Sequence, residues 1–203
     1  CDALPGMRLF VDLETRGKAE RQAGRNTFIS THSLEDVGRI KAQLQRAPLM
    51  VRVNPLHEGT PSELNAVLAH GADMVMLPMF HTADELRVFS RIVAGRVPIV
   101  ALLETAGALR SLGDWVNTVG LFEVFVGLND LHLELGCRFM FEPLAQGLLD
   151  DVAACVKAHG LRFGFGGIAR LDEGLLSGRD VLAGHIRLGS QAVMLSRTFH
   201  RGR

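Results

Sequence analysis

Two acidic residues stand at the ends of apolar runs that are typical of buried strands. Glu104 closes the run ALLE, and Asp130 closes VFVGLND. Because the carboxyl ends of parallel strands meet at one edge of a sheet, the two carboxylates would be neighbours and would repel each other unless a proton or cation lay between them. Mg²⁺ and Mn²⁺ commonly bind one or two protein carboxylates together with water and substrate oxygens. The pair therefore predicts a divalent-metal site, although Asp130 alone is equally well explained as a helix N-cap.

A single arginine, Arg52, interrupts the apolar run LMVRV. Burying a guanidinium group without an anion is costly, so Arg52 needs an acidic partner. One candidate partner is a substrate carboxylate, bound through two parallel hydrogen bonds. The alternative is a structural ion pair with Asp12, Glu14 or Glu104, and the two roles are compatible.

The elements that would position these residues are seven short apolar runs, separated by segments with helix-forming patterns. Val, Ile, Leu, Phe and Met fill the runs without strict alternation, which is typical of parallel strands covered on both faces. Residues 33–36, 60–63 and 82–85 each begin with a hydroxyl residue and end with an acid, as helix starts do. The expected strands lie in residues 7–14, 48–55, 73–80, 97–105, 123–130, 162–169 and 185–195.

Alternating strands and helices predict βα units, arranged either as an open doubly wound sheet or as a closed (β/α)8 TIM barrel. The barrel is favoured because polar residues follow four different strands, and these converge on one mouth only if the sheet closes. With seven strands counted, we expect a first strand and helix upstream of Cys1 that this chain lacks. Residues 1–203 are expected to form a single domain, since no linker divides them. The polar residues at the strand ends are Asp12, Glu14, Arg52, Asn54, Glu104, Asn129 and Asp130.

Composition argues against several classes of partner. Lys+Arg and Asp+Glu are balanced at 22 each, and with no tyrosine, one tryptophan and no basic cluster nothing favours binding to nucleic acid. No apolar run reaches the ~18 residues of a membrane span, and no signal-peptide pattern is present. The three cysteines lack metal-binding spacing and are interpreted as reduced thiols. We therefore expect a cytoplasmic protein without membrane or nucleic-acid partners.

Five motifs, in their order along the chain, resemble the HpcH/HpaI aldolase and citrate lyase β-subunit family of phosphoenolpyruvate/pyruvate-type barrel enzymes. The resemblance runs from about Leu9 to Ser196, and the order and spacing of the motifs make it specific. The motifs are VDLE followed by a basic helix, VRVNP, MLPMF, LLET and VGLNDLHLELG.

The resemblance implies that Glu104 and Asp130 bind Mg²⁺ or Mn²⁺ and that Arg52 contacts the substrate. It also implies activity on 2-keto acids or acyl-CoA thioesters, in which a carbon–carbon bond is made or broken through a metal-stabilised pyruvate-type enolate. A homo-oligomer is expected on the same ground. The backbone lining the substrate carboxylate pocket would come from Gly127, Leu128 and Asn129.

Two positions depart from the family pattern. Thr15 stands where the aldolase branch has a histidine used in proton transfer, and Leu102 stands where some aldolases have a glutamine. The catalytic base is therefore not identified. Asp12 and Glu14 are candidates to position a base or to hold metal-bound water, and a metal-bound hydroxide is a further candidate.

Other motifs are weaker. His57, His81 and His132 follow strands, but histidines in such places more often have a structural or surface role than a catalytic one. GFGGIA, residues 164–169, formally fits a dinucleotide-binding turn, but the next strand ends in Gly-Ser-Gln rather than an acid, so close packing in a barrel turn explains it better.

Together these observations predict a metal-dependent carbon–carbon lyase, a class II aldolase that cleaves or forms 2-keto acids, on a (β/α)8 barrel. The alternatives are an acyl-CoA thioester lyase of the citrate or malyl-CoA lyase type and a non-catalytic ligand-binding barrel.

Overall fold

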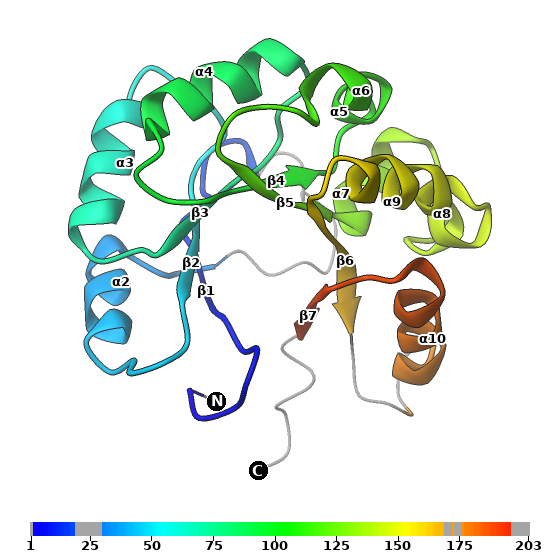
Figure 1. Ribbon diagram of the computed structural model, residues 1–203, viewed down its shortest axis with the longest axis horizontal. Coiled ribbons are helices and arrows are strands. Elements are labelled where there is room, and N and C mark those ends of the chain that lie inside the picture. The colour runs from blue at the N-terminus through cyan, green and yellow to red at the C-terminus, as the bar shows by residue number, and fades with distance from the viewer. Residues whose placement is uncertain (1, 19–29, 169–171, 173–175, 196–203) are drawn as a thin grey trace.

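The described part of the computed structural model comprises residues 2–18, 30–168, 172 and 176–195. Its seven strands form one parallel sheet in which each strand pairs with the next along the chain, and the sheet curls with helices on its outer side (Figure 1). β1 and β7 form its two edges. The strands are β1 (Leu9–Asp12), β2 (Leu49–Arg52), β3 (Met74–Leu77), β4 (Ile99–Leu103), β5 (Leu121–Val126), β6 (Arg162–Ile168) and β7 (Ala192–Leu195).

The helices begin where the local chemistry predicts or close to it. The Thr82 side chain accepts a hydrogen bond from the backbone of Glu85 at the start of α4, and the Ser33 N–H donates to Asp36 at the start of α2. The helices of the described residues are α2 (Leu34–Lys41), α3 (Thr60–Ala69), α4 (Ala83–Val93), α5 (Ala106–Arg110), α6 (Leu112–Trp115), α7 (Leu128–Glu134), α8 (Glu142–Ala145), α9 (Leu148–Ala158) and α10 (Gly178–Leu188).

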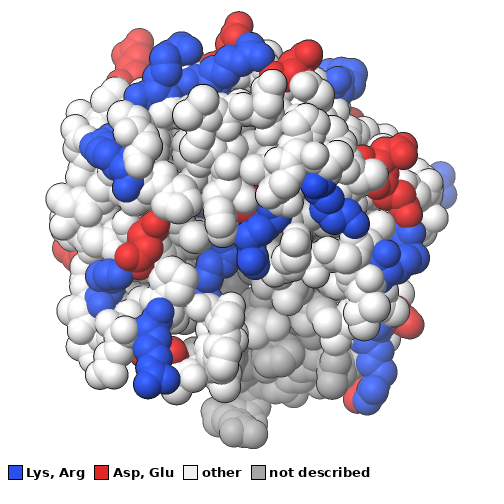
Figure 2. Space-filling model, viewed as in Figure 1, with Lys and Arg blue, Asp and Glu red and all other residues white. Residues whose placement is uncertain are grey.

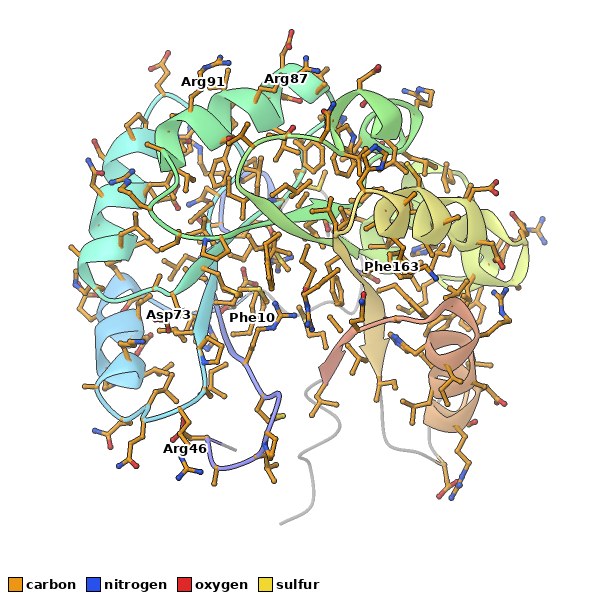
Figure 3. All side chains as sticks on the ribbon, in the orientation of Figure 1. Phe10, Arg46, Asp73, Arg87, Arg91 and Phe163 are labelled. Atoms are coloured by element: carbon orange, nitrogen blue, oxygen red, sulfur yellow. The ribbon has the colours of Figure 1, made fainter. Side chains whose placement is uncertain are left out.

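The sheet separates two apolar cores. The larger core lies between the sheet and the helices, where Phe163 packs, and the smaller one lies on the concave side, where Phe10 packs (Figure 3). The concave core is rich in methionine, an unbranched side chain that fills irregular gaps. Its buried members are Met50, Met74, Met76, Val100, Leu102 and Phe125.

The strands follow one another in the order expected for a (β/α) barrel. The sheet they form is a curled half-barrel, because in the described part of the chain β1 and β7 are not paired with each other. All seven expected runs contain a strand. The eighth strand expected upstream of Cys1 stays a prediction. The basic helix expected after VDLE falls largely on residues 19–29, outside the described part of the chain.

Three local predictions were wrong. Residues 185–188 belong to α10 rather than to a strand, because His185 and Leu188 lie on the buried face of a helix capped by Ser177. Thr60 is the first residue of α3, and Gly59 is its N-cap, since the Thr60 hydroxyl instead accepts from the His57 N–H. The glycines of residues 164–167 lie within β6 rather than in a turn.

Gly164 shows why β6 contains glycine. A Cβ at Gly164 would lie 2.6 Å from the Ala192 carbonyl oxygen and 2.8 Å from the Phe125 ring. The residue is therefore required for close packing of β6 against β5 and β7. No helix in the described residues is long and apolar enough to cross a membrane.

Candidate active site

Arg52 and Asp12 lie side by side at the carboxyl ends of β2 and β1. The strand register pairs the two residues directly, and Arg52 donates from Nε to Asp12 Oδ1 at 2.9 Å and from Nη2 to Oδ2 at 2.7 Å. Burial disfavours ionisation of Asp12, but hydrogen bonds and charge from Arg52 and then Lys18 outweigh it and lower the pKa of its carboxyl to about 2. The structural ion pair weighed for Arg52 is therefore present.

A buried lysine extends this ion pair into a network. Lys18 Nζ lies 2.7 Å from Asp12 Oδ2 and 3.3 Å from Glu14 Oε2, and Arg52 Nη2 lies 3.4 Å from the same Glu14 oxygen. Glu14 and Lys18 are almost fully buried. Sequence reasoning missed Lys18, and the available signal was a lysine four residues after Glu14 in DLETRGK.

Glu104 lies at the end of β4, buried beside other acids. Its Oε1 accepts a hydrogen bond from the Met79 N–H at 3.1 Å. Burial, together with the charges of Asp130 and Glu14, raises the pKa of its carboxyl to about 8, although the charge of Arg52 opposes the rise. The fold thus brings Glu104, Asp130 and Arg52 within electrostatic reach, as the sequence predicted.

The donor to Glu104 comes from a strained backbone. Met79 has a φ of 53°, in the left-handed region that non-glycine residues rarely occupy. Strain of this kind persists only where the surroundings impose it, and it clusters at functional sites. The end of β3 is therefore shaped to direct the Met79 N–H at the Glu104 carboxylate.

Gly127 makes room for Glu104 itself. A Cβ at Gly127 would lie 2.8 Å from Glu104 Oε2 and 2.9 Å from Glu104 Cβ. The approach of substrate to the Gly127 backbone, expected from the sequence, stays a prediction; the structure adds that the Glu104 side chain lies against this glycine. Glycine is required because contacts under 3 Å force the carboxylate to move.

Asp130 is not an N-cap. The N-cap of α7 is Gly127, and Asp130 is the third residue of the helix, where an acid interacts favourably with the helix dipole. Leu128 packs into the core and Asn129 is exposed. The competing interpretation of Asp130 as a cap is therefore wrong, while its role as a metal ligand and the substrate-lining role of residues 127–129 stay predictions.

The donor set suits one kind of cation. Among the described residues, no group of three or more His, Cys, Asp and Glu is placed to hold a metal ion. A zinc site of three or four protein ligands is therefore not formed by these residues. Glu104 and Asp130 match the one or two carboxylates with which proteins bind Mg²⁺.

Of the three histidines considered from the sequence, His57 and His132 have side-chain hydrogen bonds to other groups. His57 Nδ1 accepts from the Gly59 N–H at 3.0 Å, and Nε2 donates to Glu63 Oε2 at 3.0 Å. His81 is exposed, and His132 donates from Nδ1 to the Leu128 carbonyl at 2.9 Å. His57, with both ring nitrogens used, has a structural role.

That role is to support the loop after β1. Glu63 Oε1 accepts from the Asn54 backbone and side-chain amides, and Asn54 Oδ1 accepts from the Thr15 and Arg16 N–H groups. A histidine not considered from sequence, His32, accepts at Nδ1 from the Asp12 N–H at 3.2 Å. The segment carrying Asp12 and Glu14 is therefore held from both sides.

The family model for HpcH/HpaI aldolase/citrate lyase matches residues 9–161. The chain belongs to this family. It is 31% identical over 140 residues to a (3S)-malyl-CoA thioesterase of Cereibacter sphaeroides strain KD131, covering 65% of this chain and 49% of that protein. A second such thioesterase, of strain ATCC 17029, is 31% identical over 114 residues, 55% of this chain and 40% of that protein. The chain spans about half the length of these relatives or less.

Solved structures share the fold at low identity. An HpcH/HpaI aldolase/citrate lyase family protein of Burkholderia cenocepacia J2315 superposes with a TM-score of 0.68 at 17% identity, covering 94% of this chain and 88% of that chain. The HpcH/HpaI aldolase of Desulfitobacterium hafniense DCB-2 gives 0.68 at 16%, with coverages of 94% and 86%. Citrate synthase SbnG gives 0.67 at 16%, with the same coverages. The names of these family members are those of enzymes, among them aldolases, a synthase and thioesterases.

Proposed function

We propose that this protein is a divalent-metal-dependent carbon–carbon lyase that acts on a 2-keto acid. The observation that carries the proposal is the buried Glu104 carboxylate, whose pKa is raised to about 8 by burial and by the charges of Asp130 and Glu14. Acids held together in this way are typical of sites that bind a cation or transfer protons.

Glu104 and Asp130 would hold the cation. A divalent ion between two carboxylates removes their repulsion and favours the ionised form of both. Mg²⁺ or Mn²⁺ fits two oxygen donors of this kind, and when bound it supplies Lewis-acid stabilisation of negative charge on a substrate oxygen. The Glu104 carboxylate can hold this position because Gly127 has no side chain to displace it.

Arg52 would bind the keto oxygen of the substrate. Asp12 occupies its Nε and Nη2, and in the described residues no acceptor occupies Nη1. The bidentate pair fixes the guanidinium plane, so that Nη1 is oriented before substrate arrives. Donation from Nη1 would strengthen as negative charge develops on the keto oxygen during bond cleavage, which is how a preorganised donor lowers a barrier.

Proton transfer is assigned to Glu14 in preference to Asp12. With a pKa of about 2, the Asp12 carboxyl is a weak proton acceptor. Glu14 lies between Lys18 and Arg52. Lys18 would keep both acids in position, and Asp12 would act by orienting Arg52.

A second candidate is a lyase or hydrolase of an acyl-CoA thioester. It is favoured by the relatives of 31% identity, which are named (3S)-malyl-CoA thioesterase. Such a substrate also presents a carboxylate or keto oxygen that Arg52 could bind, so the same residues would serve either reaction.

The test separates the two substrates. Protein stripped with EDTA and then given Mg²⁺ or Mn²⁺ is assayed for α-proton exchange of pyruvate, for cleavage of a 2-keto acid, and for consumption of malyl-CoA. We expect metal-dependent exchange and cleavage of the keto acid, lost in Glu104→Gln and retained in the exposed control Glu58→Gln. Malyl-CoA turnover without pyruvate exchange would support the second candidate. Absence of all three activities would contradict both.

A further inference from the structure

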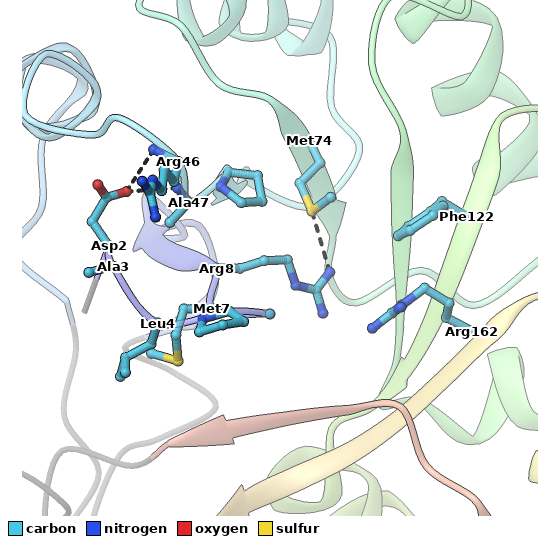
Figure 4. Close-up of a pocket in the computed structure, with 13 residues that line it drawn as sticks. Asp2, Ala3, Leu4, Met7, Arg8, Arg46, Ala47, Met74, Phe122 and Arg162 are labelled. Carbon is cyan, nitrogen blue, oxygen red and sulfur yellow. Dashed lines mark hydrogen bonds between the residues drawn. The ribbon is translucent and has the colours of Figure 1, made fainter.

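A cavity of about 510 Å³ lies at the amino-terminal ends of the strands, opposite the candidate active site (Figure 4). Its walls come from residues 2–8 before β1, residues 46–48 before β2, the first residue of β3, the second residue of β5 and the first residue of β6. Arg52 and Glu104 lie at the other end of the strands, and each strand is four residues long or longer. It is therefore a distinct place in the molecule.

Three arginines line this cavity: Arg8, Arg46 and Arg162. Basic side chains lie near the middle of the face shown in the space-filling view (Figure 2). The acid that lines the cavity with them, Asp2, is directed at the backbone, since its carboxylate accepts from the N–H groups of residues 45, 46 and 47 at 3.1, 3.0 and 2.7 Å. Within the described residues the Asp2 carboxylate forms no hydrogen bond or ion pair with the three guanidinium groups, so it is not their partner.

One buried carboxylate serves two of the arginines. Glu123 is fully buried, and Arg8 Nη2 donates to both of its oxygens at 2.7 and 2.9 Å. Arg162 Nε donates to Glu123 Oε2 at 3.1 Å. Two positive charges thus face a single negative charge, and this cluster carries an excess of one positive charge.

The arginines retain donors that lack an oxygen acceptor. Arg8 Nη1 donates only to the sulfur of Met74, at 3.4 Å, and thioether sulfur is a weak acceptor. Arg162 Nη2 donates to the Gln191 carbonyl, and Nη1 has no acceptor in the described residues. Arg8 is 19% exposed, so its unused donor is only partly reached by water. In Figure 4 the Arg8 and Arg162 guanidinium groups point toward each other, and a dashed line joins Arg8 to the Met74 sulfur.

Apolar surface borders the same space. Phe122 and Leu4 are 39% and 59% exposed. The Arg162 guanidinium lies over the Phe122 ring, with 5.7 Å between its Cζ and the ring centroid. An arginine stacked on an aromatic ring keeps its in-plane donors available for an anion. The cavity therefore combines cationic donors with an apolar wall.

A purely structural role explains only part of this arrangement. The Arg8–Glu123–Arg162 cluster joins the residue before β1 to β5 and β6, which stabilises this end of the sheet. Two arginines on one carboxylate can be structural, but that role uses neither the remaining positive charge nor the Nη1 donors of Arg8 and Arg162, which lack an oxygen acceptor in the described residues.

We propose that the cavity binds the oxyanion group of a small metabolite, a carboxylate or a phosphate, between Arg8 and Arg162. Arg46 contributes long-range attraction from the rim, and Phe122 contacts the apolar part of the ligand. The site is independent of the proposed lyase chemistry at the other end of the strands.

The experiment uses the methionine methyl groups as local reporters. Protein labelled with ¹³C at the methionine methyls is treated with EDTA and titrated with pyrophosphate and, separately, with citrate, at constant ionic strength. Met7 and Met74 line the cavity, whereas the Met79 N–H binds Glu104 in the active site. We expect saturable shifts of the Met7 and Met74 signals while the Met79 signal stays unchanged. The two titrations distinguish a phosphate from a carboxylate ligand.

Variants of the charged residues should change the affinity in opposite directions. Arg162→Gln should weaken binding by about tenfold or more, because a charge-assisted hydrogen bond is lost. Arg46→Gln should weaken it about threefold, because only an exposed charge is removed. Glu123→Gln should tighten binding, because the carboxylate that competes for the arginines is neutralised. Arg91→Gln, on the outer surface of α4 (Figure 3), should leave the affinity unchanged.

Several outcomes would overturn the proposal. Shifts confined to Met79 would assign binding to the active site, and the absence of saturation by either anion would remove the site. A Glu123→Gln variant that is folded by circular dichroism but binds no more tightly than the wild type would show that the arginines have a structural role only.

Discussion

The two ends of the strands carry similar arginine–carboxylate clusters with different surroundings. At the amino end, Arg8 and Arg162 share the single carboxylate of Glu123. At the carboxyl end, Asp12 and Glu14 occupy Arg52 and Lys18, while Glu104 and Asp130 add two further acids. The two clusters therefore resemble each other in their pairs and differ in what lies beside them. The second guanidinium at the amino end favours an anion, and the buried Glu104 carboxyl at the carboxyl end is the group proposed to bind a cation.

Glu104→Gln removes the carboxylate proposed to bind the metal and should have the largest effect. We expect loss of Mg²⁺ binding and a fall in turnover of about 10³-fold, since a charge that stabilises the transition state is lost. Isothermal titration with Mg²⁺ and steady-state rates measure the two effects. Glu58→Gln should change neither Mg²⁺ binding nor turnover. Unaltered Mg²⁺ affinity in Glu104→Gln would contradict a metal site at this end of the strands.

The same variant has a predicted signature in stability. With a folded pKa of about 8 and an ordinary value of 4.5, the Glu104 carboxyl binds its proton more tightly when folded, so metal-free wild-type protein loses stability as the pH rises from 4.5 toward 8. Glu104→Gln should lack this loss. Urea denaturation at pH 5 and pH 8 in EDTA checks it, and equal pH dependence in both proteins would contradict the cause given for the raised pKa.

Arg52→Lys tests whether the cation at the carboxyl end is oriented rather than merely charged. Lysine keeps the charge but cannot form the bidentate pair with Asp12 or present a fixed third donor. Turnover should fall about 10²-fold while Mg²⁺ affinity changes little. Retention of full activity would show that charge alone suffices.

Gly127→Ala tests the packing around Glu104. The added methyl would meet the carboxylate at 2.8 Å and displace it, so Mg²⁺ affinity should fall about thirtyfold. Gly113→Ala is the matched control, because a Cβ there has nothing within 4 Å. If both variants bind Mg²⁺ like the wild type, Glu104 is not a ligand held by this contact.

His185 lies outside both clusters and should show the smallest effect. It is buried, stacked on Phe165 at 3.8 Å, and its Nε2 has no hydrogen-bond partner in the described residues. Burial lowers the pKa of its imidazole from 6.5 to about 4. The unfolded chain therefore takes up the proton first, and the free energy of unfolding should decrease by an amount on the order of 2 kcal/mol as the pH falls from 6.5 to 4.

His185→Phe preserves the stacked ring and should abolish this decrease. Ser190, the partner of Nδ1, keeps hydrogen bonds to the Phe163 and Ala192 carbonyls. The exposed His81→Asn should behave like the wild type. A wild-type decrease that persists in His185→Phe would assign the effect to other groups.

Residue patterns alone predicted the strands, the starts of α2 and α4 and the family. Strands covered on both faces are continuous apolar runs, and capping chemistry is local, so both are visible in residues close together along the chain. The ordered motifs also predicted that Glu104, Asp130 and Arg52 converge, because parallel strands present their carboxyl ends at one edge.

Tertiary structure decided which partners these residues have. Lys18 looked like part of a basic helix, and only its burial against Asp12 and Glu14 assigns it to the site. Asp130 had the right type for an N-cap, but the path of the chain after β5 placed Gly127 at that position. Arg8 meets Glu123 across a separation of 115 residues. Such contacts depend on how the sheet curls. A local sequence pattern does not specify which charged residues, distant along the chain, will lie next to each other.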